Sequence, residues 1–137
     1  MKLFLDSSAF AKRFVEETGS RQVEALCAQA DELGLCVLCV PEIISALNRR
    51  LREKGLTPQD YSRAKLRLSQ DVRDAAIVNL TPEVIQSGIA LLEDHPLRTL
   101  DALHIACAQA WEADLFVSSD HRQIAAAKKA GLNAKQV

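Results

Sequence analysis

Three short apolar runs in this chain each give way to a carboxylate and then to a helix-like segment, and this pattern limits the fold more than any other feature. Apolar runs that alternate with amphipathic segments predict a parallel β-sheet with helices on both faces. In such a sheet the carboxyl ends of the strands share one edge, which is where ligands bind. We therefore expect the three carboxylates to gather there. They are Asp6, which ends residues 2–6, Glu42, which follows residues 35–40 and Pro41, and Asp120, which follows residues 115–119.

The expected elements form one α/β domain over residues 1–137, because a chain of 137 residues is long enough for a single core. Ser, Thr and Asp before the helical segments are suited to caps, and glycines after several of them are suited to stops. Strands are expected at residues 2–6, 35–40, 75–80 and 115–118, with a short edge strand at 132–137. Helices are expected at residues 8–16, 20–32, 41–54, 57–73, 82–93, 99–111 and 120–130.

Composition indicates a cytoplasmic globular protein. Hydrophobic residues make up 48% of the chain and charged residues 26%, and no apolar run approaches the roughly 20 residues that span a bilayer. The N-terminus lacks the apolar core of a secretory signal. Cys36 and Cys39 are spaced like half of a zinc site, but they lie in a strand-like run with no second pair after them. We favour buried thiols as their interpretation.

A basic stretch interrupts an otherwise acidic chain. Between Arg49 and Arg73, eight basic and three acidic residues give a net charge of about +5, although the whole chain carries −1. A basic arm on an acidic body fits a polyanion that is held near bound cations. Charge alone favours the simpler interpretation, a pair of solvated helix faces, so both interpretations stay open.

The acids differ in how easily a structural role explains them. Asp6 and Asp120 each precede a helical segment and could be helix caps, and Glu42 could be a first-turn acid that the helix dipole favours. Asp101 lies in a helical segment that is apolar nearly all round, where a buried carboxylate costs several kcal/mol unless it is paired or binds a metal. His104, one turn on, could be its partner, but we favour a satisfied core histidine.

Taken together, the acids indicate metal chemistry. Three or four carboxylates that face one cleft would hold one or two hard divalent ions such as Mg²⁺. Such ions can generate hydroxide from bound water and stabilise the oxygens of a phosphodiester during cleavage. This chemistry needs no nucleophilic side chain, and the serines beside the acids are better suited to donating hydrogen bonds. The chain has no Gly-rich phosphate loop.

Four segments, taken in order, resemble the PIN domain, and more closely the VapC-type ribonuclease toxins of toxin–antitoxin pairs. The resemblance covers nearly the whole chain, and its most specific part runs from His95 to Ala106 and contains Asp101. The last segment carries Ser119 where the family often has Asn, a departure that leaves Asp120 in place. The four segments are residues 5–20, 40–49, 95–106 and 116–120.

The resemblance implies a three-layer α/β fold, with a parallel sheet of four to five strands and helices on both faces. It implies Mg²⁺- or Mn²⁺-dependent hydrolysis of RNA phosphodiesters by metal-activated water. Ser8 and Ser119 would support the acids with hydrogen bonds. The implied metal-site and catalytic residues are Asp6, Glu42, Asp101 and Asp120.

The resemblance also implies partners, namely an RNA substrate, a cognate antitoxin that occludes the site, and a second copy of the chain in a homodimer. Residues 42–73 would form a projecting helical clip. The alternative is a PIN-like scaffold that binds RNA or protein and has lost catalysis, and the presence of all four acids argues against it. A related DNA nuclease would need extra helices, for which 137 residues leave no room. The basic side chains expected to contact RNA are Arg49, Arg50, Arg52, Arg63, Lys65 and Arg67.

Overall fold

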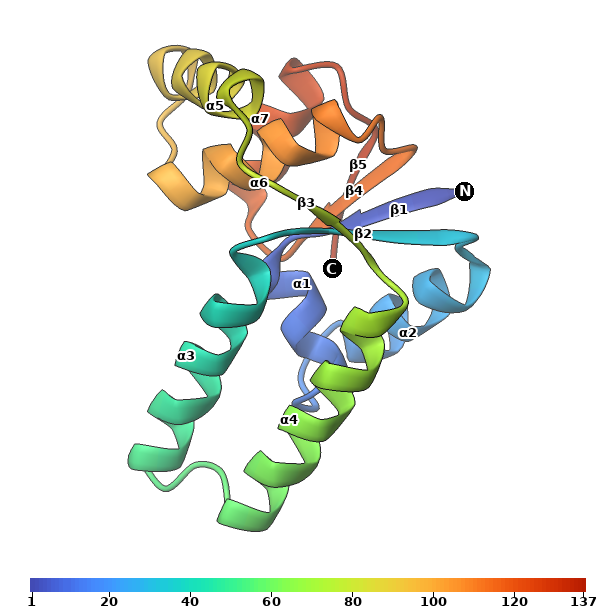
Figure 1. Ribbon diagram of the computed structural model, residues 1–137, viewed down its shortest axis with the longest axis vertical. Coiled ribbons are helices and arrows are strands. Elements are labelled where there is room, and N and C mark those ends of the chain that lie inside the picture. Colours follow the sequence, from blue (N-terminus) through green and yellow to red (C-terminus); the bar gives the residue numbers. More distant parts are fainter.

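A computed structural model describes all 137 residues as five strands, seven α-helices and one 3₁₀ segment (Figure 1). The predicted alternation of strands and helices is confirmed. The strands are β1 (Lys2–Leu5), β2 (Glu32–Cys36), β3 (Ala76–Val78), β4 (Leu115–Ser118) and β5 (Ala134–Gln136). The helices are α1 (Ser7–Phe10), the 3₁₀ segment η1 (Ala11–Arg13), α2 (Ser20–Gln29), α3 (Cys39–Arg52), α4 (Pro58–Arg73), α5 (Pro82–Asp94), α6 (Thr99–Ala110) and α7 (His121–Lys129).

The five strands form one parallel sheet in the order β3-β2-β1-β4-β5. Because every strand points the same way, every connection must cross back over a face of the sheet, and helices do so on both faces. Figure 1 shows α5, α6 and α7 on one face, and α1 and α2 with the base of α3 and α4 on the other. The carboxyl ends of the strands therefore share one edge, as predicted.

Strand β1 lies at the centre of the sheet and supplies both cores. Leu3 and Leu5 point to the side of α1 and α2, whereas Phe4 points to the side of α6 and α7. All three are fully buried, which matches the continuous apolar sequence of a strand covered on both faces. The ring of Phe4 stacks on that of Phe116 in β4, with centroids 6.1 Å apart. This packing fixes the relative position of the two strands that Asp6 and Asp120 follow.

The strand predicted over residues 35–40 exists, but its boundaries are wrong by three to four residues, because β2 spans Glu32–Cys36. Strand β2 ends at Cys36, and α3 begins at Cys39, before the predicted start at Pro41. A continuous apolar run looks the same whether it is a buried strand or the buried first turn of a helix, so the sequence pattern could not separate the two. Gly34, which follows the helix predicted over residues 20–32 and was expected to stop it, lies inside β2. A Cβ atom there would lie 2.6 Å from the ring of Trp111, so close packing explains the glycine.

The first predicted helix is also shorter than expected. It was predicted over residues 8–16, but α1 spans one turn, Ser7–Phe10, and tightens into η1 before the chain turns at Phe14. The rings of Phe10 and Phe14 meet edge to face, 4.9 Å apart. This contact turns the chain back onto the core.

Helices α3 and α4 form an antiparallel pair that projects away from the sheet (Figure 1). The amide of Asn48 on α3 donates to the Tyr61 hydroxyl on α4 at 2.9 Å, and Leu47 and Leu68 are buried between the pair and the core. Thr57 caps α4 by accepting the Asp60 N–H. The basic stretch of the sequence lies on this pair.

No helix combines the length and the apolar character that crossing a bilayer requires. The four cysteines are free thiols, and three of them, Cys36, Cys39 and Cys107, are buried.

Candidate active site

Asp6 is the most deeply buried acid, only 4% exposed, at the turn from β1 into α1. Its Oδ1 accepts the Ala9 N–H at 2.9 Å and the Ser8 hydroxyl at 2.7 Å, and its Oδ2 accepts the Ser118 hydroxyl at 2.7 Å. Burial raises the pKa of Asp6, although the positive His104 and these donors oppose it. The predicted capping role is therefore present, but the acid carries more hydrogen bonds than a cap needs.

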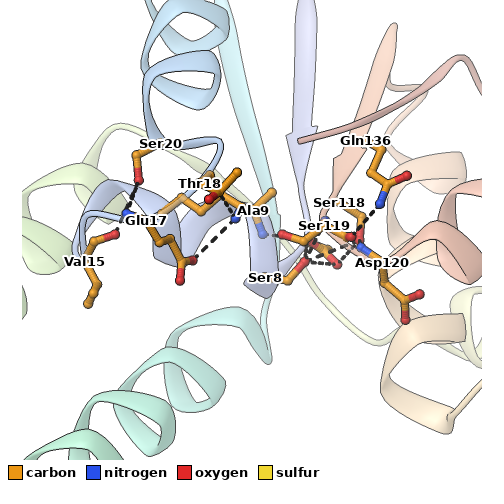
Figure 2. A network of polar contacts seen from close by, with 12 residues as sticks. Ser8, Ala9, Val15, Glu17, Thr18, Ser20, Ser118, Ser119, Asp120 and Gln136 are labelled. Carbon is orange, nitrogen blue, oxygen red and sulfur yellow. Dashed lines mark hydrogen bonds and ion pairs between the residues drawn. The ribbon is translucent and has the colours of Figure 1, made fainter. Parts of the chain in front are cut away.

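A chain of hydrogen bonds through Ser8 and Ser118 links Asp6 to the end of β4, and Figure 2 shows these two serines beside Ser119 and Asp120. Ser118, fully buried, lies 3.1 Å from the Gln123 side-chain oxygen on α7, and its hydroxyl accepts the Asp120 N–H. The Ser119 N–H donates to the Ser8 hydroxyl at 3.0 Å. Ser8 thus touches Asp6 through its side chain, whereas Ser119 takes part through its backbone. The network fixes the turn that carries Asp120.

Glu42, in the first turn of α3, belongs to a second cluster. Its Oε1 accepts the Ser7 hydroxyl at 2.8 Å and lies 2.6 Å from Nε2 of His104 on α6. Burial alone would raise the pKa of Glu42, but the hydrogen bonds from His104 and Ser7 outweigh it and hold the pKa below its ordinary value. Burial would likewise lower the pKa of His104, but the bond to Glu42 and the charge of Asp6 raise it.

The structure changes the expectation for His104. It is buried, as a core histidine would be, but it pairs with Glu42 and not with Asp101, and its Nδ1 has no hydrogen-bond partner. No local sequence pattern indicated this pairing, because Glu42 and His104 are 62 residues apart.

Asp101 and Asp120 both line a cavity of about 230 Å³, which Arg98 and Arg122 also line. Asp101 lies in the first turn of α6, and Arg98 Nε is 3.5 Å from its Oδ2. Burial and the negative charge of Asp120 raise the pKa of Asp101, against the opposing charge of Arg98. Asp120 caps α7 by accepting the Arg122 N–H at 2.9 Å.

The donor set suits a hard divalent cation, which prefers carboxylate oxygens. Asp101 and Asp120 repel each other across their cavity, and a cation between them would relieve that repulsion. With the side chains as they stand, no group of three or more His, Cys, Asp or Glu residues converges on a position that could hold a metal ion. Asp6 faces its serine donors and Asp120 its own helix, so side-chain rotation is needed before a third carboxylate can join.

The basic side chains predicted to contact RNA are held in different ways. Arg50 pairs with Glu17 at 3.3 Å, Arg67 with Glu24 at 2.7 Å and Arg63 with Asp60 at 3.5 Å. Three others, Arg49, Arg52 and Lys65, are exposed and form no ion pair.

Sequence reasoning missed two residues that shape this edge. The fully buried Gln123 lies 3.1 Å from Ser118 through its side-chain oxygen and donates to the Asp101 carbonyl at 3.1 Å, so it ties β4 to α6. Arg98 precedes α6 and lies beside Asp101. The position of Arg98, a charged residue just before the apolar helix that carries Asp101, could have indicated that it belongs to the site. For Gln123 no such indication existed, because a glutamine on an amphipathic helix is ordinarily a surface residue.

Comparison with known proteins relates most of the chain to one family. A model of the PIN domain family matches residues 3–129. Ribonuclease VapC3 of Pyrobaculum aerophilum is 32% identical over 109 residues, which cover 80% of this chain and 82% of that protein.

Two solved structures share the fold. Mycobacterium tuberculosis VapC20, a sarcin-ricin loop cleaving toxin, matches with a TM-score of 0.71 at 17% identity, over 98% of this chain and 99% of that one. The DNA-bound VapBC complex of Salmonella typhimurium contains a chain that matches with a TM-score of 0.72 at 10% identity, over 99% of this chain and 98% of that one. At such identities the match concerns the fold, and it confirms the predicted PIN-like architecture.

Proposed function

This chain belongs to the PIN domain family and, within it, to the VapC-type group, and we propose that it is a divalent-metal-dependent endoribonuclease that acts as the toxin of a toxin–antitoxin pair. The observation that carries the proposal is the gathering of acids at one sheet edge. Asp6 and Asp120 follow the neighbouring strands β1 and β4, and Asp101 lines one cavity together with Asp120.

Asp6, Asp101 and Asp120 would hold Mg²⁺ or Mn²⁺, with Glu42 as the fourth carboxylate of the site. The bound ion would supply hydroxide from water and offset charge on the phosphodiester. Glu42 is fixed by Ser7 and His104 and keeps its pKa low, so it stays a hydrogen-bond acceptor that can orient a water molecule. Ser8 holds the Asp6 carboxylate, and the Ser119 N–H holds Ser8 in turn.

We further propose that residues 1–137 act as one domain whose projecting clip, residues 42–73, contacts RNA phosphates through its basic side chains. The net charge of about +5 between Arg49 and Arg73 supports this role. Exposed basic side chains on both helices of the clip could each neutralise a phosphate. The residues concerned are Arg49, Arg50, Arg52, Arg63, Lys65 and Arg67.

A protein partner is part of the same proposal. The Salmonella neighbour is part of a VapBC complex, which supports a cognate antitoxin that blocks the site of this chain. We also propose a homodimer. Ile85 and Ile89, one turn apart on α5, are 38% and 50% exposed and supply apolar surface for a second copy.

RNA cleavage by the purified, partner-free protein tests the proposed function. Pooled cellular RNA would be incubated with Mg²⁺, Mn²⁺ or EDTA, beside Asp101→Asn and Asp6→Asn. We expect cleavage that needs the ion and falls at least about 100-fold in either variant, because each removes a charged ligand. Asp74→Asn, an exposed acid at the end of α4, is the matched control and should cut normally.

The alternative function predicts a different result. If the folded wild-type protein binds RNA but cuts none of it under any of these conditions, the chain is a PIN-like binding scaffold. Cleavage that is equally fast in Asp101→Asn would remove the acids from the mechanism.

A further inference from the structure

We propose that Arg98 and Arg49 clamp the phosphates of an unpaired RNA strand in the groove that leads to the acids, and that Arg98 marks the point where the strand enters the cleavage site. This inference rests on the ribonuclease function proposed above. It adds a path and a binding residue, Arg98, to that function.

The groove has a volume of about 690 Å³ and lies between α1, α3 and the start of α6. Glu42 and Ser7 line it together with Arg49 and Arg98. Its volume is in the range that accommodates a ligand of a few hundred daltons, such as a nucleotide or two of an unpaired strand.

Arg98 connects this groove to the acids. It is the only residue that lines both the groove and the smaller cavity between Asp101 and Asp120. A strand that lies in the groove and reaches those carboxylates must therefore pass the Arg98 guanidinium. The planar guanidinium matches a phosphate in a two-bond geometry.

The charges of the groove favour an anion. Glu42 is the only acid that lines it, and that charge is already paired with His104 at 2.6 Å. Arg49 is exposed and forms no ion pair, and the Arg98 side chain is 88% exposed with one weak contact to Asp101. An exposed pair of that length contributes little, so Arg98 can turn to a phosphate at small cost.

Elsewhere on the basic clip three arginines are already engaged, and the exposed Arg52 and Lys65, which form no ion pair, do not line the groove. Arg50, Arg63 and Arg67 are each engaged by a carboxylate, at 3.3, 3.5 and 2.7 Å. A phosphate at any of them would have to displace that carboxylate. The cations that line the groove are Arg49, which has no carboxylate partner, and Arg98, which has only its long contact with Asp101.

The groove also has apolar lining, which suits the sugar and bases of an unpaired strand. Leu38, Pro41 and Leu100 contribute to it, and Leu100 is 40% exposed. Sequence-independent contact of this kind is how proteins hold single strands, whereas a duplex turns its bases inward and presents only its backbone. The inferred substrate is therefore a loop or single-stranded segment.

Binding of a fluorescein-labelled 12-nucleotide single-stranded RNA, followed by anisotropy at several salt concentrations, tests the clamp. Arg98→Ala and Arg49→Ala would be made in the Asp101→Asn background, so that the probe stays intact. We expect each to weaken binding about tenfold at low salt and to reduce the slope of log K against log salt by about 0.7, the value for one phosphate contact on a single strand.

Arg21→Ala is the matched control, because Arg21 is an exposed arginine on α2 that lines neither cavity. It should leave affinity and slope unchanged. Arg98→Lys keeps the charge but loses the planar fork, and we expect it to restore only part of the affinity.

Two results would overturn the clamp while leaving the proposed function standing. In one, both alanine variants bind the strand as the parent does, although the wild type cuts RNA in an Asp101-dependent way. In the other, they lose affinity for a poly-glutamate peptide but not for RNA, which assigns the groove to an acidic protein segment. Equal loss against a duplex of the same sequence would contradict the unpaired substrate. A wild type that neither binds nor cuts RNA would remove the proposed function itself.

Discussion

Single residues at the site are held in different electrostatic states by their surroundings. Burial raises the pKa of Asp6 and of Asp101, so both acids hold a proton more readily than a carboxyl in water. His104 and Ser7 instead keep the pKa of Glu42 low, despite its burial. A cation would favour the ionised form of Asp6 and Asp101, whereas Glu42 is ionised without one. Asp6 and Asp101 therefore depend on a nearby cation to favour their ionised form, whereas Glu42 depends on its hydrogen bonds to His104 and Ser7.

The shifted pKa values of Glu42 and His104 predict how the free energy of unfolding of the metal-free protein depends on pH. The folded pKa of Glu42 is lowered, so its contribution is present above about 4.5 and is lost as the pH falls through the folded value. The folded pKa of His104 is raised, so its contribution is present below about 6.5 and is lost as the pH rises through the folded value. The pair should therefore stabilise most between pH 4.5 and 6.5.

Urea unfolding of His104→Gln in EDTA, across that range, checks this expectation. We expect the variant to lose about 1–3 kcal/mol near pH 5.5 and less at pH 8, because the charge-assisted bond is gone. His121→Gln, at an exposed position, is the control and should follow the wild type. A loss that is equal at all pH values would mean that His104 matters for packing and not for its charge.

At the scale of elements, two neighbouring serines at the junction of β4 and α7 have different structural roles. The buried Ser118 hydroxyl donates to Asp6 and accepts the Asp120 N–H, whereas Ser119 hydrogen-bonds only through its backbone. Ser118→Ala should cost about 1–3 kcal/mol in the free energy of unfolding, because it leaves buried polar groups without partners. Ser119→Ala should cost less than about 0.5 kcal/mol. Equal losses by urea denaturation would contradict this division.

The helices whose boundaries were predicted well are those that begin with a recognisable capping residue and a proline. Thr57 and Thr81 cap α4 and α5 close to where these helices were predicted to begin, and each is followed by a proline in the first turn. The β2–α3 junction was misplaced because Cys36 and Cys39 lie in one unbroken apolar run. No local signal there divides strand from helix, and the boundary depends on how the run packs against the sheet.

Gly34 illustrates a constraint that comes from packing between elements. Its neighbour in space is Trp111, 77 positions away in the chain, so no local pattern identified the contact. Gly34→Ala would force a methyl group to within 2.6 Å of the Trp111 ring and 2.9 Å of Phe4, which we expect to cost about 1–3 kcal/mol.

Gly55→Ala is the matched control, because the nearest atom to its Cβ would be 3.7 Å away. Thermal unfolding should show a lower Tm for the first variant and an unchanged or slightly higher one for the second. A Gly34→Ala protein as stable as the wild type would mean that Trp111 can move aside at no cost.

For the whole molecule, the parallel sheet made the site predictable in outline. Acids after β1 and β4 had to meet at one edge, whichever helices covered the faces. The order of the strands and the partners of each acid were not predictable, because Glu42–His104 and Gln123–Asp101 contacts join residues far apart in the chain. Such contacts depend on the packing of α3, α6 and α7 around the sheet.

The arrangement of the molecule also separates its proposed interaction surfaces. Helix α5 lies on the opposite side of the sheet from the projecting α3–α4 pair, where RNA is proposed to bind (Figure 1). The exposed Ile85 and Ile89 on α5 are therefore free for a second copy while the clip is occupied. Isologous contact of such a surface with itself is the commonest way to form a dimer.

Light scattering coupled to size-exclusion chromatography tests this dimer. We expect about twice the mass of 15.1 kDa for the wild type and a shift toward that single-chain mass for Ile89→Lys, because a lysine would place a charge in an apolar contact. Leu66→Lys is the matched control, since Leu66 is 61% exposed on α4, on the clip, and should leave the mass unchanged. A monomeric wild type would rule out the dimer, and a shift only in Leu66→Lys would move the interface to the clip, where dimerisation and RNA binding would compete.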